Sequence, residues 1–218
     1  GLQYGRSGGY GGVFLSSGTL NTGRIENNST TATSVSVLQV SGGTLNNSEW
    51  TIQRNPRAEI TISGGTYDRT GASQNLAIAY SGSATSLNTL TVAGGQVINT
   101  GRSVTFGQVN NNTALARGVL NLNGGTLTTN SILHFRTADT ATQSTVNFNG
   151  GTLKAAADAE SFLDYSGTGG TGALTAYING PFGSYAGGAV IDTAGFSVGI
   201  PLSLLAPTGK GVSGIPVD

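Results

Sequence analysis

The single histidine of this chain and its only cluster of acidic residues, which could do acid–base or metal chemistry, lie in its second half. The single histidine is His134, and three carboxylates, Asp158, Glu160 and Asp164, follow it. An imidazole beside a carboxylate is a common pair for general acid–base catalysis. Three carboxylates close together could bind Ca²⁺ or supply a glycosidase pair. Each chemistry requires the fold to bring these side chains to one place.

The elements expected to carry these residues favour structural roles for them. Strand alternation places His134 and Asp164 on the outward side of neighbouring strands, where an exposed cross-strand pair contributes about 0.2–1 kcal/mol. The three carboxylates are expected to form a solvated corner loop. Enzymes built on stacked β-strands need acidic residues grouped on one face. In this chain the other acidic residues and the eight arginines are scattered along the sequence. We therefore predict that the chain has no catalytic, cofactor-binding or metal-binding residues, that it binds no cofactor, and that it is not an enzyme.

The composition of the chain excludes several classes of partner and chemistry. The 218 residues include 36 glycines, charged residues make up only 9%, and the formal net charge is zero. Phosphate backbones are bound by clustered Lys and Arg, so nucleic acid and anionic membranes are poor candidate partners. The chain has no cysteine, which excludes disulfides and thiol chemistry. No apolar stretch approaches 18 residues, so we expect no membrane insertion.

A pair of glycines followed by a small or polar residue and an apolar residue recurs along the chain. The five clearest copies are SGGTL at 41–45, SGGTY at 63–67, AGGQV at 93–97 and NGGTL at both 123–127 and 149–153, and a sixth, AGGAV, lies at 186–190. A unit of this size is typical of a solenoid, a propeller or an array. The glycines supply the backbone freedom that a sharp corner requires.

Each of the first five Gly pairs follows a segment in which apolar and polar residues alternate, which is the pattern of a half-buried strand. We expect two inward columns before the corner: Leu38, Ile60, Leu90, Leu120 and Val146, then Val40, Ile62, Val92, Leu122 and Phe148. After the corner, one apolar residue of each unit should point inward: Leu45, Tyr67, Val97, Leu127, Leu153 or Val190.

A further strand is expected in each of these five units, at 48–53, 76–81, 102–107, 131–136 and 161–166. Its predicted inward columns are Trp50, Ile78, Val104, Leu133 and Leu163, then Ile52, Tyr80, Phe106, Phe135 and Tyr165. The outward column between them would hold Thr51, Ala79, Thr105, His134 and Asp164.

Three short strands per unit predict an all-β chain folded as a right-handed parallel β-helix of about seven three-stranded coils. A propeller blade is the alternative, but it needs about four strands in roughly 40 or more residues. Only residues 154–162 have a helical composition, and one turn at a corner would account for them. We expect a flexible Gly-rich segment over 1–12, the repeat domain over 13–200, and a Pro-rich extended edge or linker over 201–218.

The strongest repeat, STVNFNGGTLKA at 144–155, is followed by GGAVIDTAGF at 187–196. This pattern resembles the autotransporter-associated β-strand repeat, also called the passenger-associated transport repeat. The resemblance covers roughly residues 38–198. It implies a bacterial protein that is secreted or displayed on the cell surface.

The sequence therefore favours a non-catalytic structural β-helix that serves as a stalk, an adhesin segment or an extracellular fibre subunit. The alternative is a carbohydrate-binding or polysaccharide-degrading β-helix, with Tyr4, Tyr10, Tyr177 and Tyr185 as aromatic residues that could be exposed. Solenoid ends normally require caps, and the sequence shows none. We expect the ends to contact other copies or flanking segments of a longer chain, with surface carbohydrate as a further candidate partner.

Overall fold

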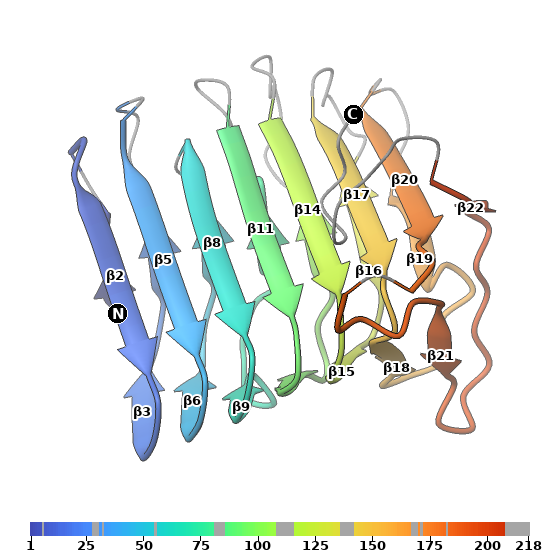
Figure 1. The fold of residues 1–218 in the computed structure, drawn as a ribbon, viewed down its shortest axis with the longest axis horizontal. Helices are drawn as coiled ribbons and strands as arrows, with labels where there is room; N and C mark the ends of the chain where they lie inside the picture. The colour runs from blue at the N-terminus through green and yellow to red at the C-terminus, as the bar shows by residue number, and fades with distance from the viewer. Residues whose placement is uncertain are drawn as a thin grey trace.

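The structure is a computed structural model that describes residues 1–5, 7–27, 31, 33–54, 56–80, 86–107, 116–135, 142–166, 170, 172–181 and 183–207. Its strands form three parallel sheets stacked as a β-solenoid (Figure 1). The expected all-β parallel fold is confirmed, and no helix occurs in the described ranges. Strands β2 to β19 make six full turns, and β1 and β20 to β22 add partial turns at the ends, close to the seven coils expected.

Sheet 1 contains the strands that precede the Gly pairs. In spatial order these are β2 (Tyr10–Leu15), β5 (Val35–Val40), β8 (Arg57–Ile62), β11 (Ser86–Val92), β14 (Ala116–Leu122), β17 (Gln143–Phe148), β20 (Ala173–Ile178) and β22 (Leu204–Leu205).

Sheet 2 contains β3, which follows the corner at residues 16–18, and the strands that follow the Gly pairs. They are β3 (Thr19–Thr22), β6 (Thr44–Asn47), β9 (Thr66–Asp68), β12 (Gln96–Asn99), β15 (Thr126–Thr129), β18 (Thr152–Ala155) and β21 (Val190–Asp192). Sheet 3 completes each turn with β1 (Leu2–Gln3), β4 (Ile25–Asn27), β7 (Thr51–Gln53), β10 (Leu76–Ile78), β13 (Val104–Phe106), β16 (Ile132–Phe135) and β19 (Leu163–Ser166).

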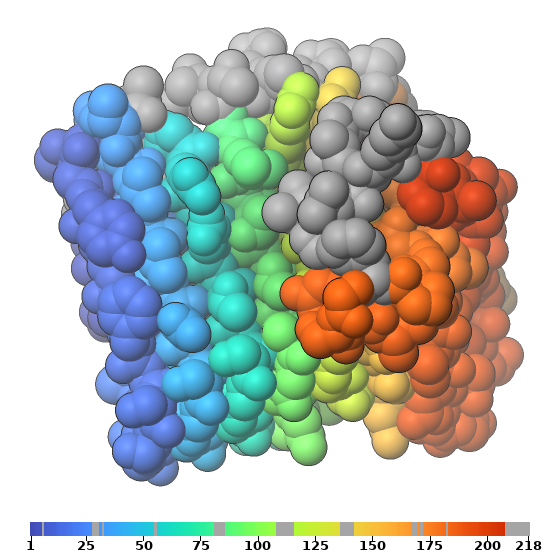
Figure 2. Space-filling view, viewed as in Figure 1, coloured from blue at the N-terminus to red at the C-terminus, as the bar shows by residue number. Residues whose placement is uncertain are grey.

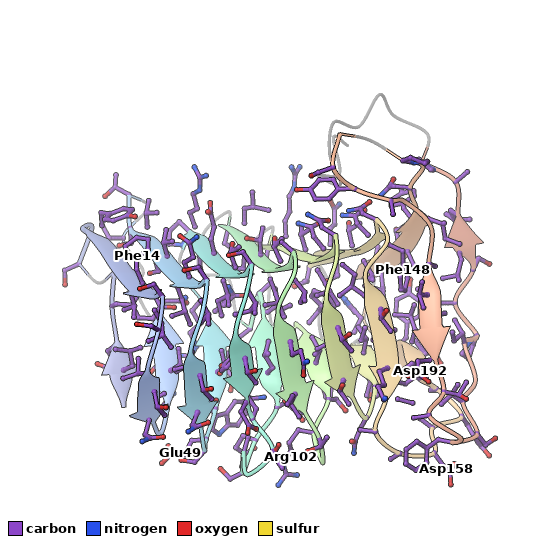
Figure 3. The ribbon with its side chains drawn as sticks, turned by 60° about the horizontal axis from the view of Figure 1, so that its bottom comes forward. Phe14, Glu49, Arg102, Phe148, Asp158 and Asp192 are labelled. Atoms are coloured by element: carbon purple, nitrogen blue, oxygen red, sulfur yellow. The ribbon has the colours of Figure 1, made fainter. Side chains whose placement is uncertain are left out.

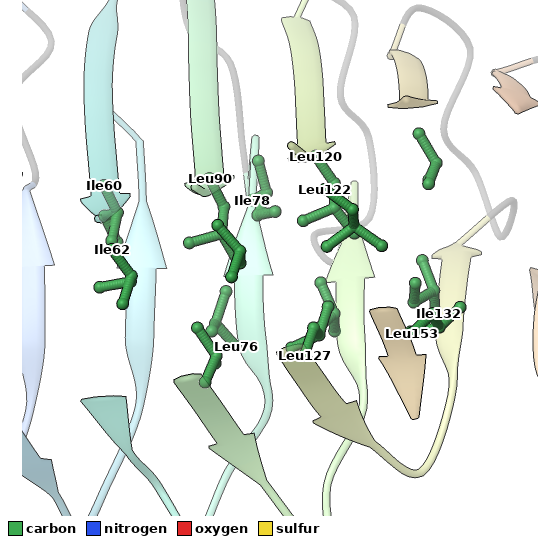
Figure 4. Packing of buried hydrophobic residues seen from close by; sticks show 14 of the residues in the cluster. Ile60, Ile62, Leu76, Ile78, Leu90, Leu120, Leu122, Leu127, Ile132 and Leu153 are labelled. Carbon is green, nitrogen blue, oxygen red and sulfur yellow. The ribbon is translucent and has the colours of Figure 1, made fainter. Parts of the chain in front are cut away.

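The predicted inward columns of sheet 1 are confirmed. Leu90 pairs with Ile60 on one side and Leu120 on the other, and all three are fully buried. Figure 4 shows these side chains meeting those of sheets 2 and 3 inside the coil. Full burial of such a side chain contributes about 1.5–3 kcal/mol, so the repeated columns hold successive coils together.

The Gly pairs form the corners between sheets 1 and 2. Gly43 and Gly65 have φ of 72° and 66°, in the left-handed region. A Cβ on Gly65 would lie 2.4 Å from the carbonyl oxygen of Gly43 in the preceding coil. Glycine is therefore required here both by backbone conformation and by the close stacking of corners.

The sixth Gly pair has a different register, and the prediction that Val190 points inward is wrong. Leu153 pairs with Ile191, which packs against the core, whereas Val190 is 49% exposed. The backbone of Gly150 donates to the Gly188 carbonyl, so the pair is shifted by one residue relative to the other corners. A one-residue shift moves every side chain of a strand to the opposite face.

Sheet 3 also departs from its predicted register. Thr51, Leu76, Val104, Ile132 and Leu163 form one column, and it points inward. Val104, Phe106, Leu163 and Tyr165 were predicted correctly, whereas Trp50, Ile52, Leu133 and Phe135 lie one position away from the inward columns. Ile78 also points inward, but it lies in the second inward column, beside Phe106, and not in the first column with Val104. On the outward side, Ile52 and Ala77 are also buried, so apolar residues occur on both faces.

Strands extend into both end segments of the chain. Residues 2–3 form β1 and residues 10–12 begin β2, so these parts of the segment 1–12 belong to the first coil. Residues 154–162 contain no helical turn and continue from β18 through bends and turns. Of the Pro-rich segment 201–218, Leu204–Leu205 pair with β20, and residues 208–218 lie outside the described ranges.

Candidate functional site

His134 and Asp164 do not form the outward pair that alternation predicted. His134 is fully buried and pairs in register with Tyr165, while Asp164 pairs with Leu133 on the opposite face of sheet 3. The His134 Nδ1 lies 3.1 Å from the Ser144 hydroxyl, and its ring packs edge-to-face against that of Tyr165. The histidine thus has a packing role in the core.

The three acidic residues make different local contacts. Asp158 accepts a hydrogen bond from the Ser197 amide at 2.7 Å, and Asp164 accepts one from the Ser161 hydroxyl at 2.9 Å. Glu160 is exposed. Figure 3 shows Asp158 at the lower edge of the carboxy-terminal end. Within the described ranges, no three His, Asp or Glu side chains are grouped as a metal site would require.

A buried polar cluster that the sequence analysis missed lies at the corner between sheets 2 and 3. Arg69, directly after β9, is fully buried. Its Nε donates to Asn47 Oδ1 at 2.8 Å, Nη1 donates to Asn99 Oδ1, and Nη2 donates to the carbonyls of Glu49, Gln74 and Asn75. Burial lowers the pKa of Arg69. Counting two residues on from inward-facing Tyr67 would have placed this arginine inside.

Aromatic side chains occupy three different environments. Tyr4 is buried in the first coil, and the rings of Trp50 and Tyr80 pack edge-to-face at 5.6 Å with the Arg54 guanidinium 4.5 Å from the Tyr80 ring centre. On the outer side of β2, Tyr10 is 68% exposed and Phe14 63% exposed. Figure 3 shows Phe14 at the amino-terminal end of this face. Tyr177 and Tyr185, the other two tyrosines that the sequence analysis considered as candidates for exposure, are partly buried on the outer side of sheet 1.

A groove of ≈ 450 Å³ crosses the outer face of sheet 1 over β8, β11, β14 and β17. Its wall contains Tyr185, from the segment 179–189 that joins β20 to β21. This segment folds back over the sheet face, where Figure 2 shows it in orange. The floor consists mostly of hydroxyl and amide side chains: Thr61, Thr89, Thr91, Asn121, Asn123, Gln143 and Thr145.

Ladders of asparagines position part of this floor. Asn147 Nδ2 donates to Asn121 Oδ1 at 2.9 Å. At the corner, Asn149 Nδ2 donates to Asn123 Oδ1 at 2.5 Å and Asn179 Nδ2 donates to Asn149 Oδ1 at 2.6 Å. Because asparagine occupies the same corner position in three successive coils, the middle amide, that of Asn149, donates to one neighbour and accepts from the other.

The amino-terminal end of the solenoid is open, in that no strand of the described residues lies beyond it. The strands β2, β3 and β1 are the outermost strands of their sheets, and the core side chains Leu2, Val13, Leu15 and Leu20 are only partly buried there. The amides of Val35 and Ser41 donate to the Gly9 and Leu15 carbonyls. Since alternate residues of a parallel strand bond to the same neighbour, the backbone groups of Tyr10, Gly12 and Phe14 face the open edge.

The carboxy-terminal end is covered, which corrects the expectation that neither end is capped. β21 and β22 add to sheets 2 and 1. Below sheet 3, the amides of Ala159 and Phe162 donate to the Ser197 and Gly199 carbonyls. The partly buried side chains of Ile191, Val198, Ile200, Leu202 and Leu204 pack on the last coil. The two ends of the solenoid are therefore chemically different.

Comparison of the chain with protein-family models, with curated proteins and with solved structures finds no match in any of the three. Within the residues that the structure describes, no helix has the length and apolar character needed to span a membrane.

Proposed function

We propose that this protein is a non-catalytic structural β-solenoid, serving as a stalk, adhesin segment or fibre subunit that is secreted or displayed on a bacterial surface. The open amino-terminal coil carries this proposal. Its outer strand β2 turns the backbone groups of Tyr10, Gly12 and Phe14 away from β5, with no strand of the described residues on that side, and core residues there are half-exposed. A further parallel strand is the partner that satisfies both. The repeat resemblance supports the bacterial surface location.

We propose that the added coil comes from a second copy of the chain or from a flanking segment of a longer chain. We assign no catalytic role to Asp158 or Asp164, because their carboxylates accept hydrogen bonds from the Ser197 amide and the Ser161 hydroxyl within the fold. Zero net charge adds little long-range repulsion between copies.

The substitution Gly12→Pro tests the proposal at the open edge. Proline removes an amide that faces outward from β2 and leaves the bonds to β5 in place, so the fold should persist. Gly12→Ala is the matched control, because it adds a Cβ at the same crowded position and keeps the amide. We expect light scattering to show concentration-dependent association for the unsubstituted chain and the Ala variant, but a monomer for the Pro variant.

A stable monomer at high concentration for all three proteins would overturn association through β2. Association of the Pro variant equal to that of the control would equally exclude this edge. Circular dichroism of each variant establishes that the comparison is made between folded proteins.

A further inference from the structure

We propose that the groove on the outer face of sheet 1 binds an acidic oligosaccharide. This binding site is separate from the open edge at β2, so the proposal of ligand binding does not depend on whether copies of the chain associate. Four strands contribute to the groove. Neighbouring strands lie ≈ 4.8 Å apart, so the floor extends about 14 Å along the solenoid axis and suits an elongated ligand rather than a single small molecule.

The chemistry of the floor fits a ligand rich in hydroxyl groups. Thr89, Thr91 and Thr145 present hydroxyls, and Asn121, Asn123 and Gln143 present amides. Both types of group donate and accept hydrogen bonds, as do the hydroxyls of a sugar. Leu87 and Val119 lie among these polar side chains, so a sugar chain lying across the strands meets both polar and apolar partners.

The Tyr185 wall supplies the apolar surface that a sugar ring needs on one side. An aromatic ring offers a large, flat contact area with a polar tip. The segment that carries Tyr185 is fixed at its far end, since the Gly187 amide donates to the Asn149 carbonyl at 3.1 Å and the Gly188 amide to the Asn179 carbonyl at 2.8 Å. The wall is thus attached to the asparagine ladder that forms one side of the floor.

The charge of the groove favours an acidic ligand. Arg57 and Glu59 pair at 2.6 Å and neutralise each other. Arg117, in the next but one strand, is exposed and makes no ion pair within the described ranges. It leaves one uncompensated positive charge on the groove, and a guanidinium binds a carboxylate through two parallel hydrogen bonds.

Two other classes of ligand fit the groove less well. An extended peptide binds by pairing with a sheet edge, whereas β8 to β17 lie inside sheet 1 and are paired on both sides. A nucleic acid strand needs several cationic contacts with its phosphates, and the groove offers one. A uronate-containing chain combines sugar hydroxyls with a carboxylate for Arg117.

The test is titration calorimetry of the full chain with hexagalacturonate, with uncharged maltohexaose as the matched probe. We expect saturable binding of hexagalacturonate that weakens with added salt, and no comparable binding of maltohexaose. Arg117→Gln should weaken binding at least about tenfold, which corresponds to about 1.4 kcal/mol. Tyr185→Ser should also weaken it. The control Lys154→Gln removes a positive charge from sheet 2, outside the groove, and should leave affinity unchanged.

Three results would overturn the proposal: no saturable binding of hexagalacturonate at millimolar concentration, equal binding of the two hexasaccharides, or unchanged affinity in Arg117→Gln. Unchanged affinity in Tyr185→Ser would place any binding elsewhere on the protein. Arg117 is exposed, so its substitution is expected to leave the fold intact, and circular dichroism checks this.

Discussion

The Nε of Arg69 donates a 2.8 Å hydrogen bond to the Oδ1 of Asn47, which lies in the coil before it, at the same corner. Both residues are buried. The guanidinium forms no ion pair with a carboxylate within the described ranges, and amide and carbonyl oxygens surround it instead. The cation therefore joins three coils through hydrogen bonds, since its partners lie on β6, between β6 and β7, on β12 and just before β10.

Replacement of Arg69 by lysine should destabilise the fold. An ammonium has no planar fork and cannot reach all of these acceptors. A buried acceptor left unpaired costs about 1–3 kcal/mol, so we expect Arg69→Lys to lower the free energy of unfolding by at least about 2 kcal/mol in urea titration. Arg57→Lys, at a pair in which the arginine is 62% exposed, should change it by less than about 1 kcal/mol. Equal effects would contradict the structural role of Arg69.

The stability of the fold should fall as the pH rises above about 10. Burial raises the pKa of Tyr67 and of Tyr4 above the ordinary tyrosine value. The unfolded chain loses these protons near pH 10, while the folded chain retains them, so the stabilisation is complete below pH 10 and is lost above it. Urea titrations from pH 8 to 11 should show a smaller alkaline loss for Tyr67→Phe than for the unsubstituted chain. An identical pH dependence would contradict this contribution.

The inward register of sheet 1 predicts unequal effects of two aspartate substitutions. Leu122→Asp places a carboxylate in the fully buried column and should cost several kcal/mol. Thr128→Asp, on the outer side of β15 beside Lys154, should cost less than about 1 kcal/mol. Thr105 is not a suitable control, because it faces outward from sheet 3 and is nevertheless fully buried. Equal loss of stability at residues 122 and 128 would mean that the register is wrong.

The asparagine ladder should stabilise the fold measurably where it is buried. Asn149→Ala removes the partner of both Asn123 and Asn179, and we expect it to lower the free energy of unfolding by about 1–3 kcal/mol. Asn46→Ala removes an amide that donates to Asn21 at 2.7 Å on the exposed side of sheet 2. Water replaces that bond, so the loss there should be well under 1 kcal/mol. The same loss at both positions would exclude a special role for the buried ladder.

Sheet 1 could be predicted from the sequence because its strands are long and alternate strictly between apolar and polar residues. Ile60 and Leu90 lie in the same column for this reason. Sheet 3 could not, since several of its strands have only three residues and both faces are buried. Polar Thr51 and His134 face inward there, while apolar Ile52 faces outward, so the periodicity of hydrophobic residues gives the opposite register.

The groove was beyond prediction for a different reason. The polar residues of its floor follow the ordinary alternation of a strand with one outward face, so they give no sign of a groove. Its wall depends on how residues 179–189 return across the sheet. The sequence contains one signal of that return. The segment between β20 and β21 is longer than the three-residue corners of the other units, such as 63–65 and 123–125, and it contains both Pro181 and Tyr185.

Residue-resolved amide exchange in β2 is the measurement that most directly tests whether the open coil accepts another strand. In the dilute monomer, we predict slow exchange at Gly11, Val13 and Leu15, which bond to β5, and fast exchange at Tyr10, Gly12 and Phe14. Under conditions of association, the second set should become protected as well. Protection of all six amides in the monomer would show that the edge is already covered, and fast exchange of Tyr10, Gly12 and Phe14 in the assembled state would show that association does not use it.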